Sequence, residues 1–543
     1  MKKRYLLLLL LPFFGLLYFI KPETGQDLSP ITEEKPFVII VPSFNNAPYL
    51  EKTLQSIFSQ KYENYKVIYI DDHSFDDSFQ KAEYWIGQLD RKKRTTLIQN
   101  PSNLGATANF YTAAQLCQNH EILVLLDGDD CLAHEEVLSL LNRAYANPHT
   151  WMTYGGSLDY PQYEKKPLEK KLPSKLFRAS SFRKYPAVPP HLTTGYAALF
   201  KQIHIEDLFY RGHFFPMGSE YAFLYPLLEM AGKHSLYSEK PLYLKNTQNP
   251  LSETILLGNF QQECLEYLRS RPRYAALNEL PLPEASTKTA DLIIFSSDNP
   301  LQLCALLESI DSHVKGLNKI TILYRSSSSD FESGYLELKL DYPQITFISY
   351  AHNFQALFQK TLFDSPLTQS PYILFAKDTL IIQRPVDLVH CITLLESTHA
   401  YGVYLDHHLN LKFSSLLNRF EPVPPRCPLL DAYAWQFSSG MDDWNTPQNL
   451  NFSLYRKQDL KRVFTSATFT TPETFLEEWG PHISESKVGL FFADPHCFNL
   501  VSDQTPKDLL KKFHAGLKLD LSLFSPLQPE SQEISSNFSF IHK

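Results

Sequence analysis

Short apolar runs alternate with helical patterns along the first part of this chain. Residues 49–60 carry apolar side chains at helical spacing, and residues 106–118 are also expected to be helical. The strands are expected at residues 37–41, 65–70, 95–98 and 122–126. Alternation of strand and helix with short connections predicts a doubly wound, mostly parallel α/β sheet.

The opening pattern returns in the second half of the chain. A shift of 253 residues aligns residues 39–72 with 292–325 without a gap, and nine of the 34 aligned positions are identical. The later apolar run 372–375 corresponds to the run that begins at residue 122. The repeat predicts two tandem domains from a duplication. They are expected at residues 36–265 and 286–502, followed by a tail at 503–543 with one short helix and a loose end.

The N-terminus has the pattern of a membrane-targeting segment. Residues 5–20 contain no charge and follow Lys2, Lys3 and Arg4. Residues 1–20 are therefore expected to be a signal-anchor or a signal peptide, with a linker at 21–35. No small-residue cleavage site follows Ile20, which favours a single-pass anchor with the domains across the membrane.

Composition is that of a folded protein with several domains. The 543 residues are 43% hydrophobic, and the net charge of −8 argues against a nucleic-acid partner. Seven scattered cysteines without a CxxC pair describe neither a disulfide framework nor a zinc site.

Three carboxylates follow the predicted strand 122–126, at Asp127, Asp129 and Asp130. Ligands of open α/β sheets bind outside the carboxyl ends of the strands, and carboxylates with substrate phosphates are typical ligands of Mg²⁺. The run indicates either a metal site that holds a diphosphate or a solvated acidic turn.

Four motifs in order resemble the start of the family 2 glycosyltransferases. They lie at residues 37–60, 67–74, 103–110 and 126–130. The resemblance implies two GT-A-like (Rossmann-like) domains after the N-terminal hydrophobic segment. It also implies transfer of a sugar from a nucleotide-diphosphate sugar to a glycan, lipid or protein acceptor, usually with inversion.

The resemblance also assigns roles to individual residues. Asp127 and Asp129 would hold Mn²⁺ or Mg²⁺, and Asp72 would accept a hydrogen bond from the nucleotide base. Asp71 would contact the ribose or cap a helix, and Phe44 would close the base pocket or only pack. The residues expected to bind the nucleotide sugar are Pro42, Phe44, Asn45, Asp71, Asp72, Asn103, Gly105 and Asn109. The arginine usual in this family is absent.

Glu220 fits the position of the family's catalytic base, at the start of a predicted helix. The family's usual Glu-Asp pair is Ser219-Glu220 here, and an ordinary carboxylate at a helix N-terminus remains the alternative. Matches to a bacterial and large-virus branch of the family place Trp151 and Tyr154 as acceptor contacts. His191 would contact the acceptor or the diphosphate, and a structural histidine is the alternative.

The second half departs from the donor-binding pattern. Tyr324 and Arg325 align with Asp71 and Asp72, and Asp378 is the one carboxylate left after the strand that matches 122–125. This predicts a degenerate GT-A-like domain that has lost donor binding. A non-catalytic glycan-binding pseudoenzyme is therefore the alternative function. Aromatic residues around Trp435 are expected to form either a carbohydrate-stacking surface or core.

Overall fold

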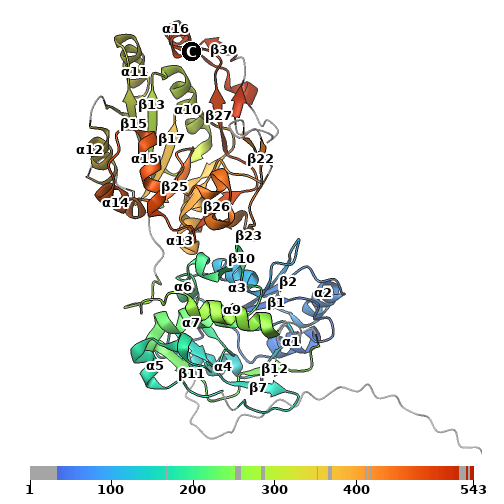
Figure 1. Ribbon diagram of the computed structural model, residues 1–543. Coiled ribbons are helices and arrows are strands. Elements are labelled where there is room, and N and C mark those ends of the chain that lie inside the picture. The colour runs from blue at the N-terminus through green and yellow to red at the C-terminus, as the bar shows by residue number, and fades with distance from the viewer. Residues whose placement is uncertain are drawn as a thin grey trace, which may run out of the picture.

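The protein folds into two α/β lobes, seen one above the other in Figure 1. The computed structural model describes residues 33–166, 169–186, 188–250, 258–282, 288–350, 353–364, 370–409, 412–414, 419–524, 533–535 and 538–542. The first lobe runs from blue to green at the bottom of the view, and the second runs from yellow to red at the top.

The first lobe is built on a seven-stranded sheet in the order β11-β6-β8-β4-β1-β2-β3. Strands β4, β1, β2 and β3 run parallel, β8 is antiparallel to β4 and β6, and β11 is parallel to β6. The strands are β1 (Phe37–Ser43), β2 (Tyr65–Asp71), β3 (Thr95–Gln99), β4 (Ile122–Leu125), β6 (Met152–Tyr154), β8 (Thr194–Tyr196) and β11 (Ser235–Tyr237). All seven residues of β1 are buried, as expected for a central strand covered on both faces.

Helices cover this sheet, and a small sheet borders its functional edge. The helices are α1 (Leu50–Phe58), α2 (Ser78–Leu89), α3 (Ala106–Gln115), α4 (Val137–Tyr145), α5 (Ser174–Ala179), α6 (Ala197–Phe200), α7 (Ser219–Ala231) and α9 (Gly258–Ser270). The small sheet has the order β5 (Cys131–Leu132), β12 (Tyr243–Asn246) and β7 (Ser157–Tyr160). Strand β12 thereby lies beside the chain that follows the acidic run.

The segment between β7 and β8 is anchored to the core of the lobe. Arg183 is buried, and its guanidinium donates to both carboxylate oxygens of Glu229 at 2.7 and 2.9 Å and to the Leu268 carbonyl at 2.7 Å. Phe182 beside it is also buried. This lysine- and proline-rich stretch is therefore held to α7 by a buried ion pair.

Arg183→Ala should destabilise the first lobe strongly. Removing one partner of a buried ion pair leaves an uncompensated charge, which costs about 3–5 kcal/mol. Urea denaturation of the full chain measures the change. Arg211→Ala is the matched control, because its pair with Glu263 is exposed and should contribute little. An equal loss of stability in the two variants would contradict the structural role given to Arg183.

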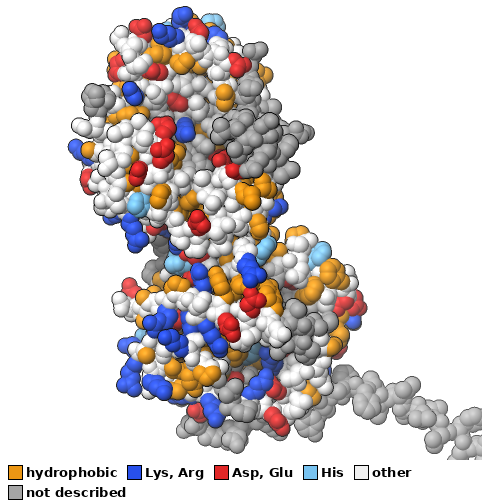
Figure 2. Space-filling view, viewed as in Figure 1, with side chains coloured by type: hydrophobic (Ala, Val, Ile, Leu, Met, Phe, Trp, Pro, Cys, Tyr) orange, Lys and Arg blue, Asp and Glu red, His pale blue; other side chains and the backbone are white. Residues whose placement is uncertain are grey.

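Exposed basic side chains gather over the same segment. Figure 2 shows Lys and Arg concentrated on the part of the first lobe that contains α5, whereas both signs mix over the second lobe. The exposed basic residues here are Lys165, Lys166, Lys170, Lys171, Lys175, Arg178 and Lys184. Positive charge is thus concentrated on one part of a chain whose net charge is −8.

The second lobe is built on a nine-stranded sheet in the order β16-β15-β13-β17-β25-β20-β26-β24-β23. Its strands are β13 (Ala290–Ser297), β15 (Leu317–Arg325), β16 (Thr346–Ser349), β17 (Tyr372–Lys377), β20 (Gly402–Tyr404), β23 (Cys427–Leu429), β24 (Ala432–Gln436), β25 (Ser453–Arg456) and β26 (Val488–Phe492). Its helices are α10 (Pro300–His313), α11 (Ser329–Asp341), α12 (Phe354–Gln359), α13 (Leu388–Thr398), α14 (Lys457–Ser466), α15 (Pro472–Trp479) and α16 (Pro506–His514).

The seven strands from β16 to β26 repeat the seven strands of the first sheet. Counted from β3 in the first sheet and from β16 in the second, the first four strands are parallel, the fifth is antiparallel to both neighbours, and the last two are parallel to each other. The register repeats as well, because Ile39 pairs with Val67 in the first sheet and Leu292 pairs with Ile320 in the second. Leu292 and Ile320 each lie 253 positions after Ile39 and Val67, which is the shift that aligns the two sequences.

Polar and aromatic side chains contact each other across the two lobes, and buried apolar residues of both lobes belong to one cluster. His204 stacks on His399 with ring centroids 4.6 Å apart, and Lys487 forms an ion pair with Glu206. After α9 the chain continues along the first lobe, where Arg271 pairs with Asp207 at 2.7 Å.

Two expectations about the ends of the chain change. The expected single-pass anchor is corrected, because no helix in the described part of the chain is long and apolar enough to cross a membrane. Residues 1–20 themselves lie outside the described residues. Within its described residues, the tail is paired rather than loose: β30 (Phe540–His542) pairs with β28 (Leu517–Leu519), and β29 (Glu533–Ser535) pairs with β27 (Cys497–Val501).

Candidate active site

The acidic run lies directly against the end of the central strand of the first lobe. A Cβ added at Gly128 would lie 2.7 Å from the Pro42 carbonyl oxygen and from Ser43 Cβ, so only glycine fits there. Asp127 and Asp129 flank this glycine and remain partly exposed. The close approach holds their carboxylates at the carboxyl end of β1 and β4.

The three carboxylates of the run differ in their partners. Asp130 is buried and accepts hydrogen bonds from the Tyr243 hydroxyl and, at 2.6 Å, from the Asn246 backbone. Tyr243 also donates to Asp127 at 3.2 Å, and the Asn249 side chain donates to Asp129 at 2.7 Å. Asp130 therefore ties the run to β12 and leaves Asp127 and Asp129 as the more accessible pair.

Charge repulsion is concentrated at this pair. Burial and the neighbouring Asp129 carboxylate raise the pKa of Asp127 to about 7. A raised carboxylate pKa means that a nearby positive charge would stabilise the ionised form. The described residues contain no group of three or more His, Cys, Asp or Glu side chains arranged to hold a metal ion. Two carboxylates with donor phosphates are a sufficient ligand set for Mg²⁺, so the pair fits such an ion.

A lysine lies among these carboxylates. Lys245 is on β12, two residues after Tyr243, so both side chains lie on one face of the strand. Burial would lower the pKa of Lys245, but the surrounding carboxylates, Glu220 first among them, raise it above its ordinary value. Sequence analysis did not single out this residue. The available signal was the two-residue spacing from Tyr243 within a short strand.

Glu220 reaches the same place from α7. The helix begins after Gly218, whose φ of 76° is accessible to glycine at little cost, and Glu220 lies in its first turn. Glu220 is partly exposed and interacts electrostatically with Asp127 and Lys245. The structure therefore brings Glu220 to the acidic run, although 90 residues or more separate them in the sequence.

His191 also lies at this edge of the lobe. Its ring stacks on Tyr243 with centroids 4.6 Å apart, and its Nε2 is 3.5 Å from Lys245 Nζ. Burial lowers the pKa of His191 well below its ordinary value, so the ring is neutral at pH 7. It orients Tyr243 and Lys245 by contact rather than by charge.

Asp72 organises the loop before α3. Its carboxylate accepts from the backbone N–H groups of Leu104 and Gly105 at 2.9 and 2.8 Å and from the Asn100 side chain at 2.7 Å. Asn103 donates to the Asp72 carbonyl at 3.3 Å and remains exposed. The φ of Gly105 is 86°, which explains the glycine there. The expected base contact of Asp72 must share the carboxylate with these three donors.

Two buried polar atoms next to this loop lack a partner among the described residues. Asp71 accepts from the Ser74 backbone at 3.2 Å through one oxygen, and its other oxygen is unpaired. Asn109 accepts from Asn100 at 2.7 Å, and its side-chain nitrogen is unpaired. Buried polar atoms are normally satisfied, so both are candidates for ligand contact.

Aromatic side chains project from the neighbouring loops. Phe44 is 38% exposed and Phe75 is 79% exposed, and their rings are in edge contact at 5.8 Å. Asn45 joins the two loops, since its side chain accepts from the Phe75 backbone at 2.8 Å. Pro42 is the buried penultimate residue of β1. The exposed pair offers an apolar surface made of two nearly perpendicular rings, and Phe75 was not identified from the sequence.

Comparison with known proteins relates this lobe to a protein family. Residues 38–208 match the family model described as Glycosyl transferase family 2. The first lobe is a family 2 glycosyltransferase domain. In the described part of this transferase lobe, the matched residues contain β1 to β4 and the acidic run.

Individual relatives match over part of their length. An uncharacterized glycosyltransferase of Haemophilus influenzae is 33% identical over 117 residues, which are 22% of this chain and 45% of the relative. The putative colanic acid biosynthesis glycosyl transferase WcaA of Escherichia coli is 28% identical over 144 residues, which are 25% of this chain and 50% of the relative. This chain thus spans about half the length of the curated relatives it matches.

Solved structures show only a weak likeness. S. aureus TarS 1–349 in complex with UDP-GlcNAc has a TM-score of 0.34 and 16% identity, over 43% of this chain and 65% of that one. The mannosyltransferase PcManGT from Pyrobaculum calidifontis, in complex with GDP-Man and Mn²⁺, has a TM-score of 0.29 and 18% identity. It covers 43% of this chain and 63% of that one.

Two expected acceptor residues of the transferase lobe lie in its core. Trp151 is 6% exposed and stacks on His234 with centroids 3.9 Å apart. Tyr154 is 1% exposed and packs against Tyr237. A direct contact of either with an acceptor does not fit this burial. From the sequence alone, a buried aromatic residue cannot be distinguished from an aromatic residue on a binding surface.

The aromatic residues around Trp435 in the second lobe are also core. Trp435 and Tyr455 are fully buried, Trp444 is 4% exposed, and all three belong to one apolar cluster. His407 stacks on Trp435, and its Nδ1 donates a hydrogen bond to the Asp406 carboxylate at 2.8 Å. The expected alternative of a carbohydrate-stacking surface does not fit this packing.

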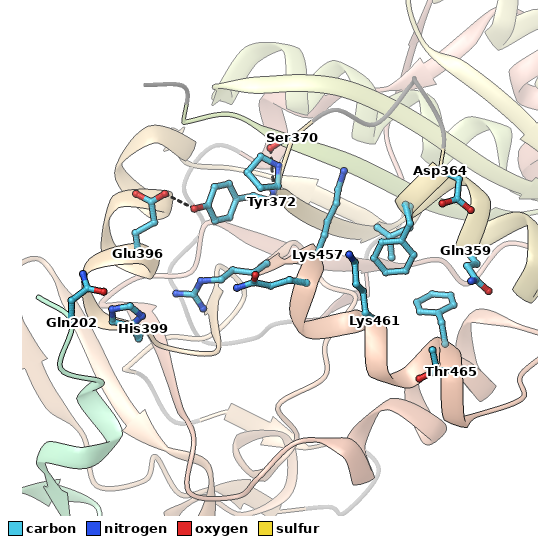
Figure 3. Close-up of a pocket in the computed structure, with 16 residues that line it drawn as sticks. Gln202, Gln359, Asp364, Ser370, Tyr372, Glu396, His399, Lys457, Lys461 and Thr465 are labelled. Carbon is cyan, nitrogen blue, oxygen red and sulfur yellow. Dashed lines mark hydrogen bonds between the residues drawn. The ribbon is translucent and has the colours of Figure 1, made fainter. Parts of the chain in front are cut away.

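A large cavity, lined mainly by the second lobe and also by Gln202 of the first, lies at the edge opposite the carboxyl ends of β15 and β17. Its volume is about 850 Å³, and it is lined by the start of β17 and the end of the antiparallel strand β25. Figure 3 shows Tyr372 directed at Glu396, to which it donates a hydrogen bond. Lys457 forms an ion pair with the buried Asp291 at 2.6 Å. These polar groups are committed to the fold.

Proposed function

We propose that this chain is a glycosyltransferase that moves a sugar from a nucleotide-diphosphate sugar to a glycan, lipid or protein acceptor, with inversion. The supporting observation is a cluster of charged side chains at the carboxyl ends of the strands in the first lobe, where the chain matches the family 2 model. The cluster contains Asp127, Asp129, Glu220 and Lys245. Ligands of open α/β sheets bind at that edge. Residues 36–265 would form the transferase domain.

Asp127 and Asp129 would hold Mn²⁺ or Mg²⁺. The raised pKa of Asp127 supports this proposal, since burial and the neighbouring Asp129 carboxylate both disfavour the ionised form, which a cation would stabilise. When bound, a divalent cation supplies positive charge beside the nucleoside diphosphate, the leaving group that takes the electron pair of its bond to the sugar.

The nucleotide would bind over the ends of β1 and β2. Phe44 and Phe75 would cover the base, while the unpaired atoms of Asp71 and Asn109 would contact polar groups of the nucleoside. Asp72 would act mainly by holding the loop Asn103–Gly105 in place. Pro42 and Asn45 would fix the loop that carries Phe44.

Glu220 would accept the proton of the acceptor hydroxyl. The acceptor oxygen then forms a bond to C1 of the sugar as the bond from C1 to the diphosphate breaks, and the electron pair leaves with the nucleoside diphosphate. A single displacement of this kind inverts the anomeric centre. Lys245 would stabilise the charge that develops on the diphosphate, and His191 would position Lys245.

Lys245→Met should lower kcat by about 10- to 100-fold, because a charge aimed at the developing diphosphate acts mainly in the transition state. Steady-state kinetics with the donor identified below measure kcat and KM separately. Lys240→Met is the matched control, because Lys240 is an exposed lysine in the loop before β12. A rise in KM with an unchanged kcat would contradict a role in leaving-group stabilisation.

The second lobe, residues 286–502, would be a degenerate copy of the first. Arg325 and Lys377 stand at positions where the transferase lobe has Asp72 and Asp127. This observation also favours the alternative function, a non-catalytic glycan-binding protein. Titration calorimetry of the full chain with UDP-, GDP- and dTDP-sugars, with and without Mn²⁺, separates the two. The transferase binds one donor in a Mn²⁺-dependent manner, whereas a glycan-binding protein binds none.

A further inference from the structure

The second sheet carries cations where the first carries carboxylates. Ile39 and Leu292 occupy the same register, and continuing along β2 and β15 places Arg325 at the position of Asp72. Ile39 pairs with Val124 and Leu292 with Leu374, so Lys377 stands at the position of Asp127. The same edge of the repeated sheet has therefore changed its charge from negative to positive.

A cavity persists at this edge of the second lobe. Its volume is about 640 Å³, within the range of small-molecule sites. The residues that line it and matter here are Arg325, Tyr350, Asn353, Phe354, Thr468 and Thr470. Tyr350 follows β16 and donates its backbone N–H to the Tyr324 carbonyl at 2.9 Å, just as Asn100 does to Asp71 in the first lobe. The cavity is thus the counterpart of the proposed nucleotide site.

The positive groups at this edge have no committed partner. Arg325 is exposed and Lys377 is partly exposed, and neither forms an ion pair or a side-chain hydrogen bond within the described ranges. The carboxylate of Asp378 is already engaged, since its Oδ2 accepts from the Ser296 hydroxyl at 2.8 Å and from the Ser297 backbone at 3.1 Å.

Arg325 lies beside the aromatic floor of the cavity. Burial and the exposed Glu473 carboxylate raise the pKa of Tyr350 to about 12, while the Arg325 guanidinium opposes the rise. Phe354 packs against Tyr350 with ring centroids 5.0 Å apart. Asn353, Thr468 and Thr470 are exposed around this floor and offer amide and hydroxyl groups.

We propose that this cavity binds an anionic carbohydrate, with Arg325 contacting a carboxylate or phosphate group and Asn353, Thr468 and Thr470 contacting sugar hydroxyls. A guanidinium pairs with both kinds of oxyanion through two parallel hydrogen bonds. No metal ion is needed, because the protein supplies the positive charge. The inference rests on the proposed function only in taking this carbohydrate to be the acceptor chain.

Titration calorimetry of the full chain in EDTA tests the proposal with three probes. Trigalacturonate carries carboxylates, a glycerol phosphate trimer carries phosphates, and maltotriose is neutral. We expect one or both anionic probes to bind and maltotriose not to bind. Which anionic probe binds more tightly identifies the charged group. Failure of both anionic probes, or equal binding of all three, would overturn the proposal.

Two variants at one position assign the site. Arg325→Gln should weaken binding of the anionic probe roughly tenfold or more, and Arg325→Lys should weaken it less because the charge remains. Arg462→Gln, an exposed arginine of α14, is the matched control and should leave binding unchanged. Unchanged binding in Arg325→Gln, with a thermal melt like that of the wild type, would refute the site.

Assays with the sugar donor distinguish a failure of the proposed anion site from a failure of the proposed transferase function. Arg325→Gln should release nucleoside diphosphate from the donor alone at the wild-type rate, because its cavity belongs to the other lobe. Loss of donor binding in Arg325→Gln would show instead that the second lobe binds the nucleotide, which contradicts an acceptor site. Loss of activity in the wild type with intact binding of the anionic probe would refute only the transferase.

Discussion

Replacing Glu220 with glutamine should lower kcat for sugar transfer by about 10²- to 10⁴-fold, the usual contribution of a general base. The amide keeps the size of the side chain but cannot take the acceptor proton. Donor binding should be unchanged, because Glu220 lies in the first turn of α7 and forms no hydrogen bond with the described nucleotide-side loops. Single-turnover kinetics with a saturating acceptor and donor measure the chemical step.

The control addresses the alternative that Glu220 only stabilises a helix N-terminus. Glu51 also lies in the first turn of a helix, α1, and is exposed. If both glutamates act through the helix dipole, Glu51→Gln and Glu220→Gln should have similar small effects on stability and activity. A general base requires a large loss of kcat in Glu220→Gln alone. Equal activity in the two variants would remove Glu220 from the mechanism.

Asp129→Asn should abolish metal-dependent transfer, with a loss of roughly 10²-fold or more in kcat/KM. The substitution removes one of the two accessible carboxylates and one negative charge from the crowded pair. The Mn²⁺ concentration for half-maximal activity should rise in the same variant, and EDTA should inactivate the wild type. Activity titrated with Mn²⁺ and with Mg²⁺ measures both effects.

A carboxylate outside the site controls for the loss of charge. Asp508 is exposed in the first turn of α16, and Asp508→Asn should leave the metal titration unchanged. Asp127→Asn should behave like Asp129→Asn if both residues bind one ion. Full activity of Asp129→Asn in EDTA would contradict a metal site at the acidic run.

The sheet of the first lobe could be predicted because its strands are short apolar runs bounded by turn residues. The predicted run 37–41 is confirmed as β1 (Phe37–Ser43), and the run 122–126 as β4 (Ile122–Leu125). Helix α2 (Ser78–Leu89) was not among the predicted elements, although Ala82, Trp85, Ile86 and Leu89 stand at helical spacing and pack against the core of the first lobe.

The site could be predicted where its residues stand in local motifs, but not where distant segments meet. Asp127, Asp129 and Glu220 were found from motifs, whereas Lys245 depends on contacts with carboxylates far away in the sequence. Arg183 was missed for the same reason, since its partner Glu229 lies on another element. Trp151 shows the converse, because a motif match cannot tell a buried ring from an exposed one.

The charge at the functional edge of the second lobe was visible from the alignment of the two halves. The persistence of a cavity at Arg325 was not, because it depends on how Tyr350 and the chain before α15 pack around it. The sequence therefore indicated loss of donor binding, while the structure adds a place for another ligand.

The most direct test is release of nucleoside diphosphate by the full chain. The protein is incubated with Mn²⁺ and each of UDP-, GDP- and dTDP-sugars, and Asp129→Asn is assayed alongside the wild type. The account predicts release from one donor by the wild type and none above background by the variant. No release from any donor by folded wild-type protein, with no donor binding by calorimetry, would contradict the assignment of a glycosyltransferase.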